Sequence, residues 1–590
     1  MSSHASRFTP HVCYLPNTSP FCRIFACMRN SLLLTFIFLS CSPSKEVPDP
    51  FSYSSKKEIT AKNGAVASAH PLASKAGIEA MKNGGNAFDA AIATQFTLAV
   101  VYPGAGNIGG GGFMVARLQS GDLVSLDFRE TAPAAAHKNM YLVSAGNIIE
   151  GKSIRSPTAS GVPGSVAGIL ATLKYAKLPL RQLIDPAINL AENGFAITAG
   201  EASSLNNLRD EFTKYNSGPI AFQKNNPWKE GDTLIQKDLA QTLKRIRDEG
   251  AKGFYEGETA KLIAEEVKRG GGYINADDLR SYQVKWRTPH SFDYKGFKIV
   301  TMDLPSSGGI VLHQMMKMIE SKPLTSNPYL SPQAVQLMVE VERRAYADRA
   351  QYLGDADFIK VPEATLTSEE YLQGRMKDYA AGTAGKSTDV KPGVIKKESE
   401  ETTHISIIDR EGNAVAITTT LNDSYGSKTV VQGAGFLLNN EMDDFSVKPG
   451  APNLYGAIGG EANAIEPGKR MLSSMSPTIV LKNNKPVLVA GTPGGTTIPT
   501  SVFQMLVYIL DYNTSTADAV NLPKFHHQWL PDRIDVEENF PDSTITALEK
   551  MGYTIYNRKS IGRSEVIKVL DNGSIEAVAD SRGDDSAEGY

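Results

Sequence analysis

The chain has 590 residues, of which 41% are hydrophobic and 21% are charged, and its formal net charge is −3. This composition is that of an ordinary globular protein, and a chain of this length forms several domains or one large domain. The near balance of acidic and basic residues argues against a nucleic-acid-binding or polybasic membrane surface.

All four cysteines lie near the N-terminus, at Cys13, Cys22, Cys27 and Cys41. The rest of the chain therefore has no disulfide, no cysteine metal site and no thiol nucleophile. This excludes the thiol hydrolases as a class.

Residues 28–41 have the pattern of a signal peptide. Arg29 precedes a short apolar stretch, which ends at the small residue Ser40 and is too short to span a bilayer as a helix. We therefore expect residues 1–41 to be a signal segment, with Met28 as the true start, and the protein to be exported.

The pair Ser40-Cys41 resembles a bacterial lipoprotein cleavage site. A lipid on Cys41 would anchor the protein to the outer membrane, whereas a plain secretory signal would leave it in the periplasm. Residues 42–57 are polar and contain prolines, which predicts a tether between the signal segment and a folded part that begins at residue 58.

Two alanine-rich helices are predicted over 74–83 and 87–101. The next stretch, Gly104-Ala-Gly-Asn-Ile-Gly, matches the dinucleotide-binding fingerprint, which requires a strand before the glycines and a helix after them. Here a helix precedes the glycines and the strand-like residues 112–118 follow, so we expect a tightly packed loop instead.

A strand over 123–128 ends at Arg129. Such an arginine is usually a surface or ion-paired residue, although its guanidinium can also bind a carboxylate bidentately. Residues 160–390 are expected to be mostly helical, and their segment 342–349 to be a charged helix face with structural ion pairs.

The segment 402–420 is predicted to form a β-hairpin. Residues 402–408 are β-branched at five of seven positions, Gly412 and Asn413 supply the turn, and 414–420 form the second strand.

The residues just before this hairpin, 391–401, are polar and charged, and they are interrupted by a proline and a glycine, which is typical of an exposed linker. A cut between Glu401 and Thr402 would give Thr402 a free α-amine with a pKa near 8, on the same residue as its hydroxyl. That arrangement activates a nucleophile without histidine or metal. A threonine at a strand start is nevertheless common, and the hairpin alone does not establish catalysis.

A long irregular segment, 441–470, is rich in proline and glycine, which indicates a functional or disordered loop. A second hairpin, with strands over 477–481 and 486–490, leads into Gly491-Thr-Pro-Gly-Gly. Glycines allow backbone amides to approach a ligand closely, although a glycine pair is more often a simple turn.

Several motifs in this order resemble those of the γ-glutamyltranspeptidase family, and the resemblance covers about residues 58–590. The motifs are Gly109-Gly-Gly-Gly-Phe-Met, Asp127-Phe-Arg-Glu-Thr-Ala-Pro, Thr402-Thr-His-Ile-Ser, Asn439-Asn-Glu-Met-Asp-Asp-Phe-Ser, Leu472-Ser-Ser-Met-Ser-Pro-Thr, Gly491-Thr-Pro-Gly-Gly and Phe525-His-His-Gln-Trp-Leu-Pro-Asp.

The resemblance implies an α+β fold, a four-layer αββα sandwich of the N-terminal nucleophile hydrolase type. It implies one catalytic domain over 58–590, which cuts itself into a large subunit ending at Glu401 and a small subunit, 402–590. The two subunits would remain together as a heterodimer, with neither a metal nor another cofactor.

The resemblance also implies the catalytic roles. Thr402 would attack the γ-carbonyl of glutathione or another γ-glutamyl compound and pass the glutamyl group to water or to an amino-acid amine. Thr420 would support the Thr402 hydroxyl, and the amides of Gly494 and Gly495 would form the oxyanion hole.

The substrate head is a zwitterion, so the implied site holds both signs of charge. Its α-carboxylate would be bound by Arg129, Ser473 and Ser474. Its α-ammonium would be bound by Asn422, Glu441 and Asp444. The position of Glu441 is also glutamine in the family, and Asp444 argues against the cephalosporin-acylase branch, whose substrate lacks the ammonium.

The family carries a lid loop within the segment 441–470, and Tyr455 matches the aromatic residue near its middle. Two alternatives stay open from the sequence. One is a hydrolase of poly-γ-glutamate or another γ-glutamyl amide. The other is a lipid-anchored binding protein that has lost its activity.

Overall fold

The computed structural model describes residues 49–390, 402–454, 456 and 459–590. The chain from residue 48 to 590 forms one compact unit. The predicted signal segment with Cys41, the predicted linker 391–401 with Glu401, and Tyr455 lie outside the described residues. In the part of the chain that is described, no helix is long and apolar enough to cross a membrane.

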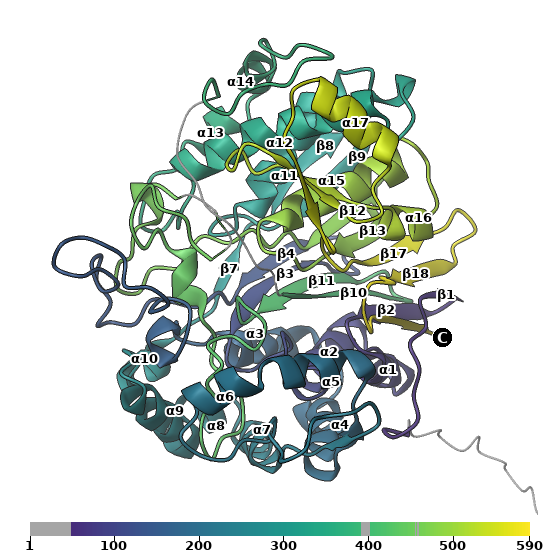
Figure 1. The fold of residues 1–590 in the computed structure, drawn as a ribbon. Helices are drawn as coiled ribbons and strands as arrows, with labels where there is room; N and C mark the ends of the chain where they lie inside the picture. Colours follow the sequence, from purple (N-terminus) through teal and green to yellow (C-terminus); the bar gives the residue numbers. More distant parts are fainter. Residues whose placement is uncertain (1–48, 391–401, 455, 457–458) are drawn as a thin grey trace, which may run out of the picture. The chain divides into compact units, whose positions relative to one another are not determined.

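Two seven-stranded antiparallel sheets lie face to face in this unit (Figure 1). In spatial order, sheet I consists of β1 (Glu58–Ala61), β18 (Ile575–Ala579), β17 (Glu565–Val569), β13 (Lys485–Gly491), β12 (Thr478–Lys482), β9 (Phe297–Thr301) and β8 (His290–Tyr294). Sheet II consists of β19 (Ser586–Gly589), β2 (Gly64–Ser68), β10 (Thr403–Asp409), β11 (Ala414–Thr420), β3 (Gly111–Arg117), β4 (Leu123–Asp127) and β7 (Lys285–Arg287).

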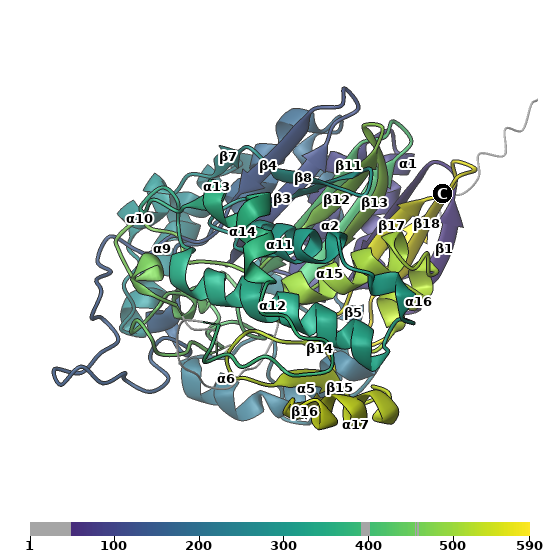
Figure 2. The ribbon, with the colours of Figure 1, turned by 90° about the horizontal axis from the view of Figure 1, so that it is seen from above.

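Helices cover the outer face of each sheet, which gives four layers (Figures 1 and 2). The helices on the side of sheet II are α1 (Pro71–Lys82), α2 (Ala87–Val101), α3 (Ser165–Ala171), α4 (Leu180–Asn193), α5 (Ala199–Asn207), α6 (Arg209–Tyr215), α7 (Lys237–Glu249), α8 (Lys252–Tyr255), α9 (Gly257–Arg269) and α10 (Ala276–Ser281). Those on the side of sheet I are α11 (Gly308–Glu320), α12 (Pro332–Tyr352), α13 (Glu363–Leu366), α14 (Glu369–Arg375), α15 (Thr497–Leu510), α16 (Thr516–Asn521) and α17 (Asp542–Lys550). The predicted αββα sandwich is confirmed.

Two small sheets complete the described elements. They consist of β14 (Phe525–His526), β15 (Ile534–Glu537) and β16 (Ile555–Arg558), and of β5 (Phe195–Ala196) and β6 (Thr233–Leu234).

The predicted hairpin 402–420 is present as β10 and β11 at the centre of sheet II. Its turn forms because the Asp409 carboxylate accepts hydrogen bonds from the backbone amides of Glu411 (2.8 Å) and Asn413 (3.0 Å), while Gly412 adopts a positive φ of 81°. Successive side chains along β10 point to opposite faces of sheet II. Ile405 and Ile407 pack into the helical layer, and His404 points to sheet I.

The glycine-rich segment that follows α2 is a packing loop, as expected. A Cβ atom on Gly109 would lie 2.1 Å from the Leu437 carbonyl oxygen, and one on Gly110 would lie 2.0 Å from the Thr420 carbonyl oxygen. These glycines bring the backbone of the loop against the end of β11, and β3 rather than a helix follows them.

The expectation of a mostly helical segment over 160–390 is wrong for residues 285–301, which form β7, β8 and β9. Strands β8 and β9 pair as a hairpin whose turn places Lys295 and Gly296 at positive φ. Buried and exposed residues alternate along β8, which is the pattern of a strand with one buried face and one exposed face. The exposed face carries a charged residue.

The tether predicted for 42–57 is also wrong over its last residues, which pack on the domain. The Lys57 ammonium donates hydrogen bonds to the carbonyl oxygens of Asp580, Gly583 and Asp585 at 2.7–2.9 Å. The Tyr53 hydroxyl donates to the Ala196 carbonyl oxygen. Hydrogen bonds to backbone carbonyl oxygens near the C-terminus therefore hold the end of this segment on the domain, although its composition is that of a linker.

The two sheets are in close contact where Gly491, the last residue of β13, meets the His404 ring. A Cβ atom on Gly491 would lie 2.2 Å from that ring. We predict that Gly491→Ala lowers the free energy of unfolding by about 1–3 kcal/mol, because the ring is packed on all sides and a methyl group would overpack the core.

The measurement is the urea midpoint, and Gly374→Ala is the control. Gly374 lies in α14, and a Cβ atom added there would have no other atom within 4 Å, so alanine is expected to be neutral or slightly stabilising. Equal midpoints for wild type and Gly491→Ala would contradict this account of the sheet contact.

Candidate active site

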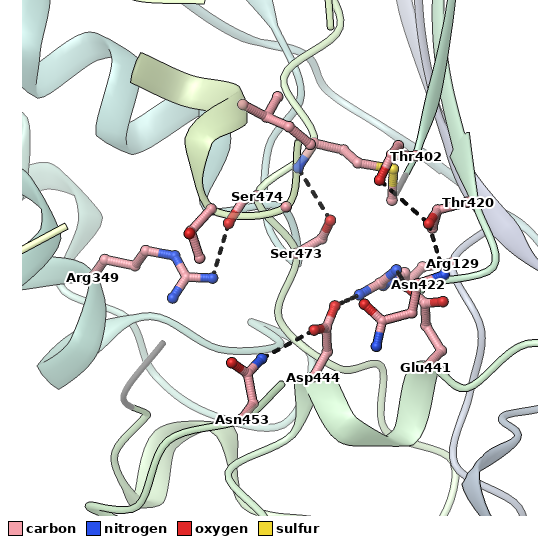
Figure 3. A pocket seen from close by; sticks show the side chains of 14 residues that line it. Arg129, Arg349, Thr402, Thr420, Asn422, Glu441, Asp444, Asn453, Ser473 and Ser474 are labelled. Carbon is pink, nitrogen blue, oxygen red and sulfur yellow. Dashed lines mark hydrogen bonds and ion pairs between the residues drawn. The ribbon is translucent and has the colours of Figure 1, made fainter. Parts of the chain in front are cut away.

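A pocket opens at the end of the central hairpin, between the two sheets (Figure 3). It is a hollow of about 330 Å³, part of which is open to solvent. Its lining residues are Arg129, Arg349, Thr402, Thr420, Asn422, Glu441, Asp444, Asn453, Ser473, Ser474, Met475, Gly495, Thr496 and Ile498.

Thr402 and Thr420 face each other because β10 and β11 are antiparallel, so that the start of one strand lies beside the end of the other. The Thr402 hydroxyl donates a hydrogen bond to the Thr420 hydroxyl oxygen at 3.4 Å. The Thr420 oxygen also accepts a hydrogen bond from the Asn422 amide at 2.8 Å. Thr402 is 5% exposed, so the pocket is its route to solvent.

Asn422 follows β11 with a positive φ of 77°, a conformation that asparagine tolerates better than most residues. Its side-chain amide donates to the Asn440 carbonyl oxygen at 3.1 Å. The turn at Asn422 thereby connects the end of β11 to the segment that carries the acidic residues.

Arg129 lies on the same side of the pocket as Thr420 and forms ion pairs with both Glu441 and Asp444 (Figure 3). Burial lowers the pKa of the Arg129 guanidinium, but the two carboxylates outweigh burial and leave that pKa above its ordinary value. Burial raises the pKa of both carboxyl groups, and Arg129 opposes that rise. In the pocket, the Arg129 guanidinium is therefore in direct contact with two carboxyl groups.

A third carboxyl group, that of Glu130, lies 3.7 Å from the Arg129 guanidinium. Neither of its oxygens has a hydrogen-bond partner within the described residues. Burial raises the pKa of Glu130 to about 8, although Arg129 opposes the shift. This group is therefore protonated at neutral pH and adds no charge to the site.

Ser473 and Ser474 lie on a segment that is held by the residues preceding α11. The Ser473 amide donates to the Pro305 carbonyl oxygen at 2.9 Å, and the Ser307 amide donates to the Ser473 carbonyl oxygen at 2.8 Å. The Ser473 hydroxyl accepts a hydrogen bond from the Met475 amide at 3.2 Å.

Gly494 and Gly495 both have positive φ angles, 137° and 53°, which other residues adopt only with strain. The Thr497 amide donates to the Gly494 carbonyl oxygen at 2.9 Å, which starts the first turn of α15. Gly495 lines the pocket, close to the N-terminal end of α15, where the helix dipole favours negative charge.

None of the described residues that line the pocket is a histidine, cysteine or lysine. The histidine nearest in sequence, His404, is packed between the hydroxyl groups of Thr418 (2.9 Å) and Ser406 (3.1 Å). Burial lowers the pKa of His404 to about 3, so it is neutral at ordinary pH.

Five lining residues were not predicted from the sequence: Arg349, Asn453, Met475, Thr496 and Ile498. Arg349 was expected on a charged helix face, but most of that face of α12 is buried, and the Arg349 guanidinium donates to the hydroxyls of Ser474 (3.0 Å) and Ser307 (2.9 Å). Asn453, in the irregular segment, donates to the Asp444 carboxylate at 3.2 Å. Neither residue stands in a sequence pattern that distinguishes it from its charged or polar neighbours.

The structure brings together most of the residues predicted for the site. Gly494 adjoins the lining, while Glu401 and Tyr455 lie outside the described residues. The protein has two helix-covered antiparallel sheets, a threonine at the start of a central strand, and a pocket over that threonine. This is the fold of the N-terminal nucleophile hydrolases.

Comparison with known proteins identifies the family. A family model described as "Gamma-glutamyltranspeptidase" matches residues 73–590. "Glutathione hydrolase proenzyme" of Escherichia coli (strain K12) is 43% identical over 574 residues, which are 95% of this chain and 99% of the relative. The chain belongs to the γ-glutamyltranspeptidase family.

Solved structures agree with this fold. The cephalosporin acylase of Bacillus halodurans superimposes with a TM-score of 0.78 at 26% identity, over 92% of this chain and 99% of its own. The γ-glutamyltranspeptidase of Helicobacter pylori gives a TM-score of 0.54 at 47% identity, over 55% of this chain and 94% of its own.

The protonated state of Glu130 predicts a pH dependence of stability. The unfolded chain loses this proton near its ordinary pKa of 4.5, whereas the folded protein keeps it up to about 8. The unfolded state therefore binds fewer protons in this interval, and the free energy of unfolding falls as the pH rises. Relative to Glu130→Gln, the wild type is expected to lose about 2 kcal/mol between about pH 5 and about pH 7.

The measurement is the urea midpoint of both proteins across this pH range. Only the change of the midpoint with pH is compared, so a constant difference in stability between the variant and the wild type does not matter. Glu370→Gln, an exposed carboxyl group in α14, is the control and should follow the wild type. Parallel slopes for wild type and Glu130→Gln would show that Glu130 is ionised in the folded protein.

Proposed function

We propose that this protein cleaves the γ-glutamyl bond of glutathione and related γ-glutamyl compounds, and passes the glutamyl group to water or to an amino-acid amine. The observation that carries this proposal is the contact of Arg129 with Glu441 and Asp444 in the pocket that contains Thr402. A nucleophile beside adjacent positive and negative groups matches a substrate whose head is a zwitterion. The relatives named glutathione hydrolase support the same substrate.

The active form is proposed to arise by self-cleavage between Glu401 and Thr402. The Thr402 hydroxyl oxygen adds to the Glu401 carbonyl carbon, the peptide C–N bond breaks, and the released amine takes the hydroxyl proton. Water then hydrolyses the ester, which leaves a large subunit ending at Glu401 and a small subunit beginning at Thr402. The word "proenzyme" in the name of the E. coli relative supports a processed precursor.

In each turnover, the free α-amine of Thr402 acts as the base for its own hydroxyl, in keeping with the absence of histidine among the described lining residues. The hydroxyl oxygen attacks the γ-carbonyl carbon, and the amides of Gly494 and Gly495 stabilise the oxyanion, a contribution of about 3–4 kcal/mol for each donor. The C–N bond then breaks, and the amine of cysteinylglycine leaves with the proton. Water or an amino-acid amine then releases the glutamyl group from the ester.

The substrate head is proposed to enter between the ion-paired groups. Its α-carboxylate would bind Arg129, with Ser473 and Ser474 beside it, and its α-ammonium would bind Asp444 and Glu441, together with Asn422. Binding replaces one set of buried ion pairs by another, so that no buried charge is left without a partner. Thr420 supports the nucleophile through its hydroxyl contact with Thr402. Tyr455 is proposed to belong to a lid over the bound head.

The protein is further proposed to be exported and to work in the periplasm or at the outer membrane. The apolar stretch after Arg29 supports export, and Ser40-Cys41 supports a lipid anchor.

A cephalosporin acylase shares the fold, and its activity is the competing assignment. The ion pair of Asp444 with Arg129 favours the γ-glutamyl assignment, because a carboxylate in this position suits a substrate ammonium. A poly-γ-glutamate hydrolase is the other alternative. The small pocket, which Asn453 of the segment 441–470 helps to line, favours glutathione, and turnover of glutathione against a poly-γ-glutamate chain separates the two.

A matched pair of donors tests the substrate assignment. A γ-glutamyl anilide and a glutaryl anilide carry the same carboxylate, and only the first carries the ammonium. We predict that Asp444→Asn lowers kcat/KM for the γ-glutamyl anilide by about 100-fold and changes that for the glutaryl anilide by less than about threefold. Arg129→Lys should lower kcat/KM for both donors by at least about tenfold, since it loses the bidentate geometry.

Two results would contradict the proposal. An equal loss for both donors in Asp444→Asn would mean that this carboxylate does not contact the ammonium. A wild-type preference for the glutaryl anilide would assign the site to the acylases.

A further inference from the structure

A second group of chemically active side chains lies outside the pocket, on the side of sheet I. His290 is the first residue of β8, Asp303 lies between β9 and α11, and Glu363 is the first residue of α13. One ligand atom from each residue lies within 4.8 Å of the others. Figures 1 and 2 show β8, α11 and α13 in the same region of this layer.

The His290 ring is fixed on both of its nitrogens. Nδ1 lies 3.1 Å from the Glu363 carboxylate, and Nε2 lies 3.0 Å from Nδ1 of His313. The His313 ring in turn stacks on Phe292, with centroids 4.3 Å apart and an interplanar angle of 6°. A histidine that is oriented by a second group through its other nitrogen is the arrangement found around metal-binding histidines.

Besides the two histidine rings, this cluster contains the carboxylates of Asp303 and Glu363. Arg287 acts electrostatically on Asp303, but its guanidinium is already paired with Asp127 (2.8 Å) and Asp357 (2.7 Å). The backbone amide of Leu304 donates to one oxygen of Asp303 at 2.7 Å, and this contact orients the carboxylate. The cluster thus joins an imidazole nitrogen and two carboxylate groups on three different elements.

We propose that His290, Asp303 and Glu363 bind a divalent transition-metal ion of the zinc class, with His313 orienting His290. One imidazole and two carboxylates are ligands that zinc accepts, and the fourth position would be taken by water. Ligand atoms around a tetrahedral zinc ion lie about 3.4 Å apart. The separation of His290 Nδ1 from the Glu363 oxygen is 3.1 Å, and the three ligand atoms all lie within 4.8 Å of one another, so side-chain movements of about 1.4 Å or less complete the site.

The site would stabilise the active pocket without taking part in its chemistry. Its three ligands are not among the pocket residues. The Asp303 carbonyl oxygen accepts a hydrogen bond from the Ser306 amide at 3.1 Å, and the adjoining residues Pro305 and Ser307 bond to both sides of Ser473. A metal ion on Asp303 would therefore fix the segment that positions Ser473.

The test is direct binding of Zn²⁺ to the purified protein after chelation, by calorimetry and by metal analysis after dialysis. The wild type is expected to bind one zinc ion per chain at this site and to unfold at a higher temperature with zinc. The double variant Asp303→Asn/Glu363→Gln keeps the side-chain shapes and should weaken binding by more than about 100-fold, and His313→Phe by about tenfold.

The matched control is Asp277→Asn/Glu370→Gln, which removes two exposed carboxylates elsewhere and should bind zinc like the wild type. Urea midpoints show that each variant folds, and His313→Phe tests the site without removing a ligand.

Wild-type affinity in both the double variant and His313→Phe, or no stoichiometric zinc in the wild type, would overturn the proposal. Equal affinity for Ca²⁺ would overturn the assignment to the zinc class. None of these readouts depends on the catalytic activity.

Discussion

The complete burial of the β10–β11 hairpin is the constraint on which the rest of the structure depends. Both faces of these strands are covered, one by the helices of the sheet II side and the other by sheet I, so every residue of both strands is buried. The register of the pair places Thr402 opposite Thr420 at the end of the hairpin. The position of Thr402 follows from strand pairing rather than from a flexible loop, and this suits a group that must be held accurately.

The second constraint is electrostatic. Arg129 and Glu441 are buried, Asp444 beside them is only 13% exposed, and any one of the three without the others would be a costly unpaired charge. The same burial keeps the neighbouring Glu130 protonated. A zwitterionic head fits this environment because it supplies one charge of each sign. A ligand with a carboxylate alone would leave the acidic side of the pocket facing an uncompensated negative charge, which opposes its binding.

Much of this arrangement could be predicted from the sequence. The β-branched run with Gly412 and Asn413 predicted the hairpin, and the order of helix, glycines and strand identified the loop at Gly109 as packing rather than cofactor binding. Strands β7–β9 were missed because polar and charged residues, such as Lys285, Arg287 and Asp293, interrupt their apolar pattern. Arg349 was missed because a charged helical run does not show which residues the tertiary structure buries. The grouping of His290, Asp303 and Glu363 joins residues far apart in the chain, and only the fold brings them together.

The central claim is that Thr402 becomes an N-terminal nucleophile. Intact mass of the purified protein, with N-terminal sequencing of any small fragment, tests it most directly. The account predicts two fragments, the smaller beginning Thr402-Thr-His-Ile, and a single uncut chain for Thr402→Ala. A wild-type chain that remains uncut after long incubation would contradict the account, because the Thr402 hydroxyl would then not be activated and no free α-amine would exist to serve as its base.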